Sequence, residues 1–500
     1  MFRLCLLVGL SAAGAYAEVV LAPLFRDGAV LQRDKPVPVW GTADAGEKVT
    51  VAFGGQSVST TTGADGRWIV TLDALPAQAT PAELVVTGKN TVAVRDVVVG
   101  EVWLLSGQSN MEWSVARSMN AKEEIAAANN PLIRHFKVAR NVATEPQTQA
   151  GGTWNATTPE TVGGFSAVGY YFARDLQRRV DVPIGLINSS WGGTPIEAWM
   201  SPLALASNPA FAVVNERWAA TLASYPQRKT AHDEAVAKWE ADRAAAQAAK
   251  QPFTRNRPGD PAGPGHPSTP TSLFNGMINP LVPYALRGAL WYQGESNAPR
   301  AAEYHALFAA MITHWRKHFG QGDFPFLWVQ LANFKVNNDA TGQTWAYLRE
   351  AQTETLSLPA TGQAVIIDIG DPNDIHPTNK QEVGRRLSLI ARHQVYQQPG
   401  DHSGPVFERA AREGATLRVY FKYADNGLTA ADKPLQAFEL AGPDRKFYPA
   451  KAVIERNTVV VSAPEVTEPV ALRYAWSNDP GANLFNGAGL PAAPFRTDTW

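Results

Sequence analysis

Residues 97 to 105 form an almost unbroken apolar run that ends in Ser106 and Gly107. The run is short, begins with β-branched residues and offers no polar face, which is typical of a central parallel strand buried on both faces. The turn that follows lies where open α/β sheets place their ligand sites. Position alone therefore makes Ser109 a candidate nucleophile, although a polar loop that happens to contain a serine explains this stretch better when it is taken alone.

Helical and buried-strand patterns alternate after this turn. Residues 168–180 have the periodicity of an amphipathic helix, and residues 182–187 form the next apolar run. Strand, helix and strand in this order predict a parallel α/β sheet. The pattern continues with a helix at 304–319 and three further buried strands at 288–292, 324–330 and 364–369.

Short alternating runs broken by turn residues flank this α/β region, for example at 49–53 before it and at 416–421 after it. Strands that bury one face and expose the other predict small β-sandwiches. We therefore expect three domains: an N-terminal β-sandwich at 18–99, an α/β domain at 100–403 and a C-terminal β-sandwich at 404–500.

The α/β pattern is interrupted at about 225–270. Residues 233–251 are rich in Ala, Glu, Lys and Gln and predict a solvent-exposed helix. Residues 252–270 are dense in Pro and Gly and predict an irregular loop. Because the α/β pattern resumes afterwards, we interpret both segments as an insertion into the α/β domain.

The first 17 residues have the pattern of a secretory signal peptide, with one basic residue, a short apolar stretch and the sequence Ala-Tyr-Ala before Glu18. This apolar stretch is too short to span a bilayer. Cys5, the only cysteine, lies within it, so the mature chain has no disulfide or thiol chemistry. We expect a soluble periplasmic or secreted protein.

Charge and composition narrow the possible partners. The net charge is -1 and the pI is about 6.8, with no basic stripe, so neither nucleic acid nor a membrane surface is expected as a partner. The 15 Trp residues give weak support for stacking on sugar rings. No protein partner is predicted.

Polar residues follow four of the expected strands and should share one cleft, because the carboxyl ends of parallel strands converge. They are Ser109, the Gly192-Gly193 pair, residues 293–297, and Asp374 with His376. His376 is the one histidine directly after a buried strand and beside a carboxylate, which makes it the natural base for a serine nucleophile.

Acyl transfer also requires N–H donors directed at the developing oxyanion. Gly192 and Gly193 lie just before an expected helix start, with Thr194 as N-cap and Pro195 at the first helical position. The backbone of Ser109, the backbone of Gly193 and a side-chain amide from Gln293 or Asn297 would provide three such donors.

These four blocks resemble the successive motifs of the SGNH hydrolases, specifically the sialate O-acetylesterase branch. They are Gly-Gln-Ser-Asn-Met at 107–111, Ser-Trp-Gly-Gly-Thr at 190–194, Tyr-Gln-Gly-Glu-Ser-Asn at 292–297 and Asp-Ile-His-Pro at 374–377. The resemblance covers nearly the whole mature chain. It implies a flavodoxin-like three-layer domain and serine-based removal of acetyl groups from sugars, without a metal or another cofactor.

Transferred onto this chain, the resemblance makes Ser109 the nucleophile and His376 the base, with Gly193 in the oxyanion hole. The usual spacing sets the acid three residues before the histidine, which here is Asn373, whereas Asp374 stands two before it. Related carbohydrate esterases use the Glu of the Gln-Gly-Glu motif, here Glu295. We expect Asp374 to orient His376, with Glu295 as the alternative.

Three further residues are expected to contact the substrate: Gln108, Trp191 and Asn275. Recognition of sialic acid would require an Arg or several N–H donors on the sugar carboxylate, and none of the four blocks contains an Arg. This favours a neutral acetylated polysaccharide such as xyloglucan over sialic acid, although Arg117 or Arg300 could still reach the site.

Two other functions remain open. A glycosidase could use a carboxylate pair such as Glu112 and Glu295, but would leave the serine and the histidine without a role. A non-catalytic glycan-binding protein would fit the two β-sandwiches and the many Trp residues. Release of acetate, rather than of reducing sugar or of nothing, distinguishes the esterase from both.

Overall fold

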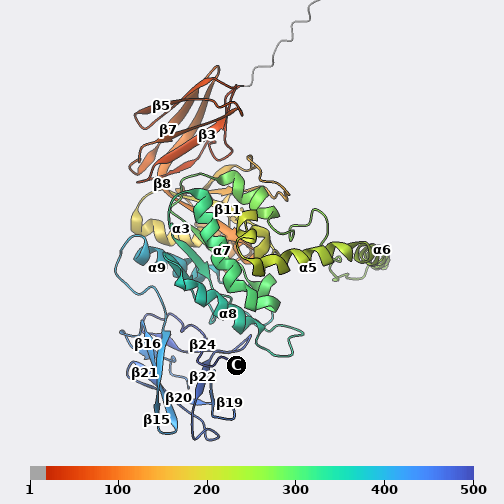
Figure 1. The fold of residues 1–500 in the computed structure, drawn as a ribbon, viewed down its shortest axis with the longest axis vertical. Coiled ribbons are helices and arrows are strands. Elements are labelled where there is room, and N and C mark those ends of the chain that lie inside the picture. Colours follow the sequence, from red (N-terminus) through yellow and green to blue (C-terminus); the bar gives the residue numbers. More distant parts are fainter. Residues whose placement is uncertain (1–17) are drawn as a thin grey trace, which may run out of the picture.

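The computed structural model describes residues 18–500, and the expected signal peptide with Cys5 lies outside them. Three regions follow one another along the molecule's long axis: an N-terminal group of strands, a central region of helices around a sheet, and a C-terminal group of strands (Figure 1). Within the described residues, no helix combines the length and apolar character needed to cross a membrane.

The central region is built on a row of seven strands that belongs to an eleven-stranded mixed sheet, and six strands of this row run parallel to one another, so the fold is α/β, as expected. The seventh strand of this row, the edge strand β10, is antiparallel to its neighbour β9. Every residue of β11 and β12 is buried, as the apolar runs predict. The spatial order is β10 (Trp154–Thr157), β9 (Asn130–Lys137), β11 (Ile184–Ser190), β8 (Thr91–Gly107), β12 (Gly288–Tyr292), β13 (Phe326–Val329) and β14 (Thr361–Ala364).

Helices cover both faces of this sheet. On one face α3 (Ala167–Val180) packs Phe172 edge-on against Trp103 of β8, with ring centroids 5.0 Å apart. On the other face α7 (Ala301–Phe319) packs Trp315 against Trp291 of β12 at 6.0 Å. The other central helices are α1 (Ser109–Glu112), α2 (Ala121–Ala126), α4 (Pro202–Ala206), α8 (Thr344–Glu354) and α9 (Lys380–Gln394).

Strand β8 runs without a break through the expected boundary at residue 99. Its first half pairs with β7 (Gln78–Thr87), and from Glu101 onward it pairs with β11 instead. The two sides also share one continuous apolar core, because the valines at 97–99 are buried against both. The N-terminal strands are therefore attached to the strand that leads to Ser109.

Apart from β2, the remaining N-terminal strands form antiparallel pairs. A three-stranded sheet contains β1 (Val20–Leu21), β3 (Val37–Thr42) and β6 (Arg67–Leu72). Strands β4 (Lys48–Phe53) and β5 (Gln56–Thr61) join β7, and the short β2 (Val30–Gln32) lies parallel to β8.

The C-terminal strands surround a second apolar core. One antiparallel sheet contains β15 (Val406–Glu413), β16 (Thr416–Lys422), β20 (Lys451–Glu455) and β21 (Thr458–Ser462). A second contains β18 (Phe438–Ala441), β19 (Phe447–Pro449), β22 (Ala471–Tyr474) and β24 (Phe495–Arg496), and β17 (Leu428–Thr429) pairs with β23 (Phe485–Asn486).

Two expected elements have different bounds in the structure. The strand expected at 364–369 ends at Ala364, because Val365 and Ile367 turn into the C-terminal core. The helix expected at 233–251 is α6 (Tyr225–Ala248), which starts earlier because Pro226 is accommodated in its first turn. Helices α5 (Ala212–Ala223) and α6 project from the central region, and no regular helix or strand follows between 249 and 271 (Figure 1).

Candidate active site

Ser109 and His376 meet at the carboxyl edge of the central sheet. Ser109 is the first residue of α1, directly after β8, and His376 lies in the segment between β14 and α9. The Oγ atom of Ser109 and the Nε2 atom of His376 are 2.8 Å apart. A neutral imidazole that carries its proton on Nδ1 accepts the serine hydroxyl at this distance, which is the geometry of a nucleophile and its base.

Two glycines allow the chain to turn sharply at the serine. Gly107 has φ of +131°, and a Cβ there would lie 2.1 Å from the carbonyl oxygen of Tyr292. A Cβ on Gly192 would lie 3.1 Å from the Cβ of Ser109. The absence of a side chain at Gly107 therefore lets the end of β8 lie against β12, and its absence at Gly192 lets the loop after β11 lie close to Ser109.

Asp374 is the carboxylate next to His376. Its Oδ1 lies 3.5 Å from His376 Nδ1 and accepts the backbone N–H of His376 at 2.8 Å. The indole of Trp113 stacks on the imidazole, with centroids 4.8 Å apart and planes 16° from parallel. Partial burial lowers the pKa of His376, while Asp374 opposes this shift, so the ring is neutral and able to accept a proton near pH 7.

Glu295 lies behind the nucleophile turn and bonds to Asn110 instead of His376. Its Oε1 accepts the side-chain amide of Asn110 at 2.6 Å, and its Oε2 is buried without a partner among the described residues. Burial raises the pKa of this carboxyl. The structure therefore places Asp374, and not Glu295, at the ring nitrogen of His376 that faces away from the serine.

A buried lysine that the sequence analysis did not identify completes this layer. Lys380 Nζ donates to Asn110 Oδ1 at 2.5 Å, and Asn110 also donates to the carbonyl of Ile375 at 3.0 Å. Burial lowers the pKa of Lys380 to about 7. One asparagine next to the nucleophile thus connects the serine turn, Glu295 and the segment that carries His376.

Of the expected oxyanion donors, the structure leaves Gly193 available. Its N–H has no partner among residues 18–500, whereas the N–H of Gly192 donates to Glu112 Oε2 at 2.9 Å. Ser109 begins α1, so its N–H has no acceptor within that helix.

The two side-chain amides expected near the oxyanion have other partners. Gln293 Nε2 donates to Asn297 Oδ1 at 2.7 Å and to the carbonyl of Thr194 at 3.2 Å. Asn297 Nδ2 donates to Glu197 at 2.8 Å. Both residues are buried and brace the loop that contains Gly193, so the structure does not direct either amide at the serine.

The residues expected to contact substrate occupy different positions. Trp191 is half-buried beside the nucleophile turn, and its backbone N–H donates to the carbonyl of Gly107. Gln108 is buried, and its side-chain oxygen accepts the N–H of Ser296 at 3.3 Å. Asn275 is fully buried and donates to the carbonyls at 143 and 144, so its expected substrate contact is not available.

Two arginines, Arg117 and Arg140, lie at the rim of the serine site, although none of the four sequence motifs contains an arginine. Arg117 is exposed, lies 3.6 Å from the ring centroid of Trp113, and has no carboxylate partner among the described residues. Arg140 pairs with Glu112 at 2.5 Å and lies over Trp191. Arg300, in contrast, pairs with Glu197 at 3.1 Å.

A hollow of about 230 Å³ opens beside Gly193. It is lined by Ser296 and Arg300, and also by Arg217 and Trp218 of helix α5. The segment before α6 therefore contributes a wall next to the serine site.

The carboxylates Glu112 and Glu295 are both engaged within the protein, which leaves no open pair for glycoside cleavage. Among residues 18–500 no group of three or more His, Cys, Asp or Glu side chains is arranged to hold a metal ion.

Comparison with known proteins gives concordant matches. The family model described as "Carbohydrate esterase, sialic acid-specific acetylesterase" matches residues 99–237 and 268–389. The sialate O-acetylesterase of Rattus norvegicus is 32% identical over 93% of this chain and 92% of its own, and that of Homo sapiens is 29% identical over 93% and 90%.

Among solved structures, a carbohydrate acetylesterase from Xanthomonas citri is 42% identical. It superposes with a TM-score of 0.82 over 97% of this chain and all of its own. The similarity thus extends over the flanking strands as well as the central region.

Proposed function

The chain belongs to the carbohydrate esterase family of sialic acid-specific acetylesterases, and we propose that it removes acetyl groups from sugars through an acetyl-enzyme formed on Ser109. Membership makes it a carboxylic-ester hydrolase. The observation that carries the serine mechanism is the 2.8 Å contact between Ser109 Oγ and His376 Nε2.

In the first half-reaction, Ser109 Oγ attacks the acetyl carbonyl carbon and its proton passes to His376 Nε2. The tetrahedral intermediate collapses when His376 returns this proton to the sugar oxygen, which leaves as an alcohol. In the second half-reaction, His376 takes a proton from water and the resulting hydroxide attacks the acetyl-serine. His376 then returns this proton to Ser109 Oγ, and the product leaves as acetic acid, which ionises to acetate in solution.

Asp374 holds the proton of His376 on Nδ1 and stabilises the imidazolium that forms in each half-reaction. Its short bond to the backbone N–H of His376 fixes the carboxylate on this side of the ring. The N–H groups of Ser109 and Gly193 stabilise the oxyanion, a contribution of about 10²–10³ in rate for each donor. Lys380, Asn110 and Glu295 support the turn from below.

We propose neutral acetylated polysaccharide, such as xyloglucan, as the substrate. Trp191 is half-exposed and is bonded through its backbone N–H to Gly107 at the end of β8, and its indole offers an apolar face to a sugar ring near the serine turn. The charge of Arg140 above it is already balanced by Glu112. An uncharged sugar therefore meets no uncompensated charge on this side of the serine.

Acetylated sialic acid is the second candidate, and Arg117 is the observation that favours it. This guanidinium is exposed, has no carboxylate partner among the described residues and lies on Trp113, which itself stacks on His376. It could receive the carboxylate of an acidic sugar.

Acetate release from acetylated xyloglucan and from acetylated sialic acid, measured side by side with the Ser109→Ala variant as a blank, separates the two substrates. Faster release from xyloglucan is the expected result. Preference for sialic acid that is lost in Arg117→Gln would replace the first candidate by the second, and release that persists in Ser109→Ala would refute the serine mechanism.

We further propose that the chain is exported after removal of residues 1–17, with β-sandwiches flanking a flavodoxin-like catalytic domain. N-terminal sequencing of the mature protein should begin at Glu18. A mature chain that retains Met1 would contradict the export proposal.

A further inference from the structure

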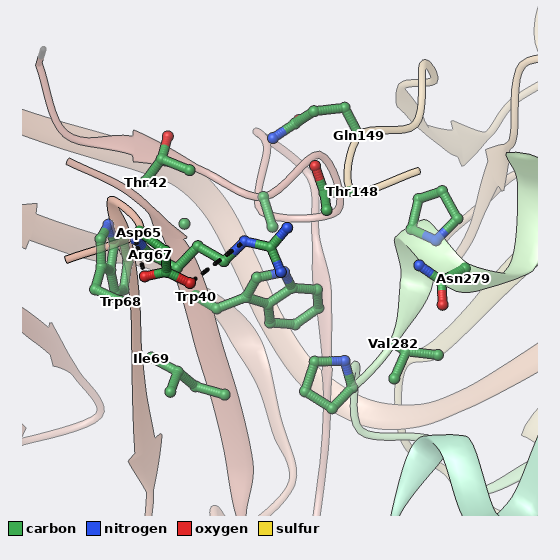
Figure 2. Close-up of a pocket in the computed structure, with 14 residues that line it drawn as sticks. Trp40, Thr42, Asp65, Arg67, Trp68, Ile69, Thr148, Gln149, Asn279 and Val282 are labelled. Atoms are coloured by element: carbon green, nitrogen blue, oxygen red, sulfur yellow. Dashed lines mark hydrogen bonds and ion pairs between the residues drawn. The ribbon is translucent and has the colours of Figure 1, made fainter. Parts of the chain in front are cut away.

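A second cleft lies far from Ser109, where the N-terminal strands meet the central region. It has a volume of about 400 Å³ and opens between the three-stranded sheet and the segment before β12 (Figure 2). Residues 279–283 form one wall, and β12 begins only at Gly288. The cleft is thus at the amino ends of the parallel strands, whereas Ser109 follows a carboxyl end.

The floor of the cleft is an outward-facing patch of the small sheet. Trp40 of β3 lies directly opposite Ile69 of β6, and Ile69 is 49% exposed. Because side chains alternate along a strand, these two face outward while Val39 and Val70 are buried beneath them. An indole and a large aliphatic side chain therefore remain accessible on one sheet face.

The indole of Trp40 packs against two buried aromatic side chains, those of Phe25 and Tyr284. Its ring contacts Phe25 edge-on with centroids 5.1 Å apart, and it contacts Tyr284 at 6.3 Å. Tyr284 in turn donates its hydroxyl to the carbonyl of Val30 at 2.8 Å. An indole fixed in this way loses little conformational entropy when a ligand stacks on it.

Polar side chains surround this apolar floor. Thr42 and Arg67 form the next cross-strand pair on the same face of the sheet, and the arginine projects toward the middle of the cleft (Figure 2). Arg67 and Asp65 are 65% and 66% exposed and only 3.9 Å apart in a loose ion pair. Gln149 and Asn279 contribute amides from the opposite wall.

We propose that this cleft binds a segment of an uncharged polysaccharide without cleaving it. A sugar ring has an apolar face that stacks on an indole and hydroxyl groups that hydrogen-bond to amide, carboxylate and guanidinium groups. The charges of Arg67 and Asp65 cancel, so no single-sign field selects an ionic ligand.

The position of the cleft separates polysaccharide binding from the proposed hydrolysis at Ser109. Because it lies at the opposite end of the parallel strands from Ser109, an occupant does not compete with the acetyl group for the serine. It anchors the polymer and raises the local concentration of acetylated units. The inference concerns binding alone, so it stands or falls separately from the serine mechanism.

The test is native affinity electrophoresis of the full chain in gels that contain deacetylated xyloglucan, with polygalacturonate as an acidic probe. The variants are Trp40→Ala and Arg67→Ala, with Trp239→Ala on helix α6 as a matched tryptophan control. We expect the apparent affinity to weaken about tenfold in Trp40→Ala, equivalent to about 1.4 kcal/mol, and severalfold in Arg67→Ala. Trp239→Ala should bind as the wild type does.

Arg67 is exposed, so its variant reports on the cleft even where Trp40→Ala fails to fold. Hydrolysis of 4-nitrophenyl acetate should stay within twofold of the wild-type rate in all three variants, and Ser109→Ala should keep its polysaccharide binding. Wild-type retardation in both Trp40→Ala and Arg67→Ala would overturn the proposal, as would stronger retardation of the wild type by polygalacturonate.

Discussion

The serine site and the Trp40 cleft differ in the burial and bonding of their polar side chains. Around Ser109 the supporting groups Asn110, Glu295 and Lys380 are buried and bonded at 2.5 to 2.6 Å. In the cleft, Asp65 and Arg67 lie in solvent and approach each other only to 3.9 Å. Catalysis requires groups that are already fixed before the reaction begins, whereas a polymer-binding surface requires groups that remain free to meet hydroxyls.

The largest effect should come from Ser109→Ala. Without the nucleophile, acetate release should fall by at least about 10⁴-fold, since only oxyanion stabilisation and binding remain. The measurement is the kcat for an acetylated sugar and for 4-nitrophenyl acetate. If the same variant also lost retention on deacetylated xyloglucan, the two regions would not be independent.

The next largest effect should come from replacing Lys380, which is buried beneath the serine turn with Asn110 and Glu295. Lys380→Met removes the donor to Asn110 Oδ1 and the positive charge that favours the Glu295 carboxylate, which should cost roughly 3 kcal/mol of unfolding free energy and lower kcat about 10- to 100-fold. Urea unfolding and steady-state kinetics measure both quantities.

The matched control is Lys122→Met, because Lys122 is exposed on α2 and should change neither value. Restored kcat in Lys380→Arg, with KM unchanged throughout, would support a positioning role. A Lys380→Met enzyme with wild-type kcat would show that the serine turn does not need this layer.

A smaller effect should show which carboxylate, Asp374 or Glu295, acts on His376, because the two substitutions should change the pH dependence of kcat/KM differently. Activity needs neutral His376, and burial puts its pKa below 6.5, so kcat/KM should fall only as the pH drops below that value. Asp374 raises this pKa, so Asp374→Asn should move the acidic limb to still lower pH. Glu295→Gln should lower the maximum value of kcat/KM and leave unchanged the pH at which kcat/KM begins to fall.

The opposite pattern, with the limb moved by Glu295→Gln and unmoved by Asp374→Asn, would assign Glu295 as the acid. Such a result would contradict the placement of Asp374 beside Nδ1 at 3.5 Å.

The smallest effect should be that of Trp40→Ala on a small ester. Because Trp40 lies at the amino ends of the parallel strands, kcat/KM for 4-nitrophenyl acetate should stay within twofold, while KM for acetylated xyloglucan should rise about threefold or more. Equal losses on both substrates would instead indicate a general effect on folding.

Local sequence signals were sufficient where the chemistry depends on a turn. An apolar run followed by Gly107 and Ser109 predicts a buried strand with a serine in the turn after it, and His376 beside Asp374 predicts a base. The parallel sheet and α7 follow from periodicity, with strand bounds that agree within three residues for β11 to β13.

Long-range contacts account for what the sequence did not predict. Lys380 stands at the start of a helix, where a lysine is ordinarily exposed, and only tertiary packing places it against Asn110. Gln293 and Asn297 have the right chemistry for an oxyanion hole, but Thr194 and Glu197 from a distant loop engage their amides. Likewise, the apolar run after Ala364 is divided between two cores, because Val365 and Ile367 are buried in the C-terminal core while Ile366 stays in the first.

The most direct test of the serine mechanism is labelling with a fluorophosphonate reagent, followed by peptide mass analysis. The account predicts complete loss of acetate release at one label per chain, on the peptide that contains Ser109, and slower labelling as the pH falls below the His376 pKa. Loss of activity with the label on another residue, or full activity with Ser109 labelled, would contradict it.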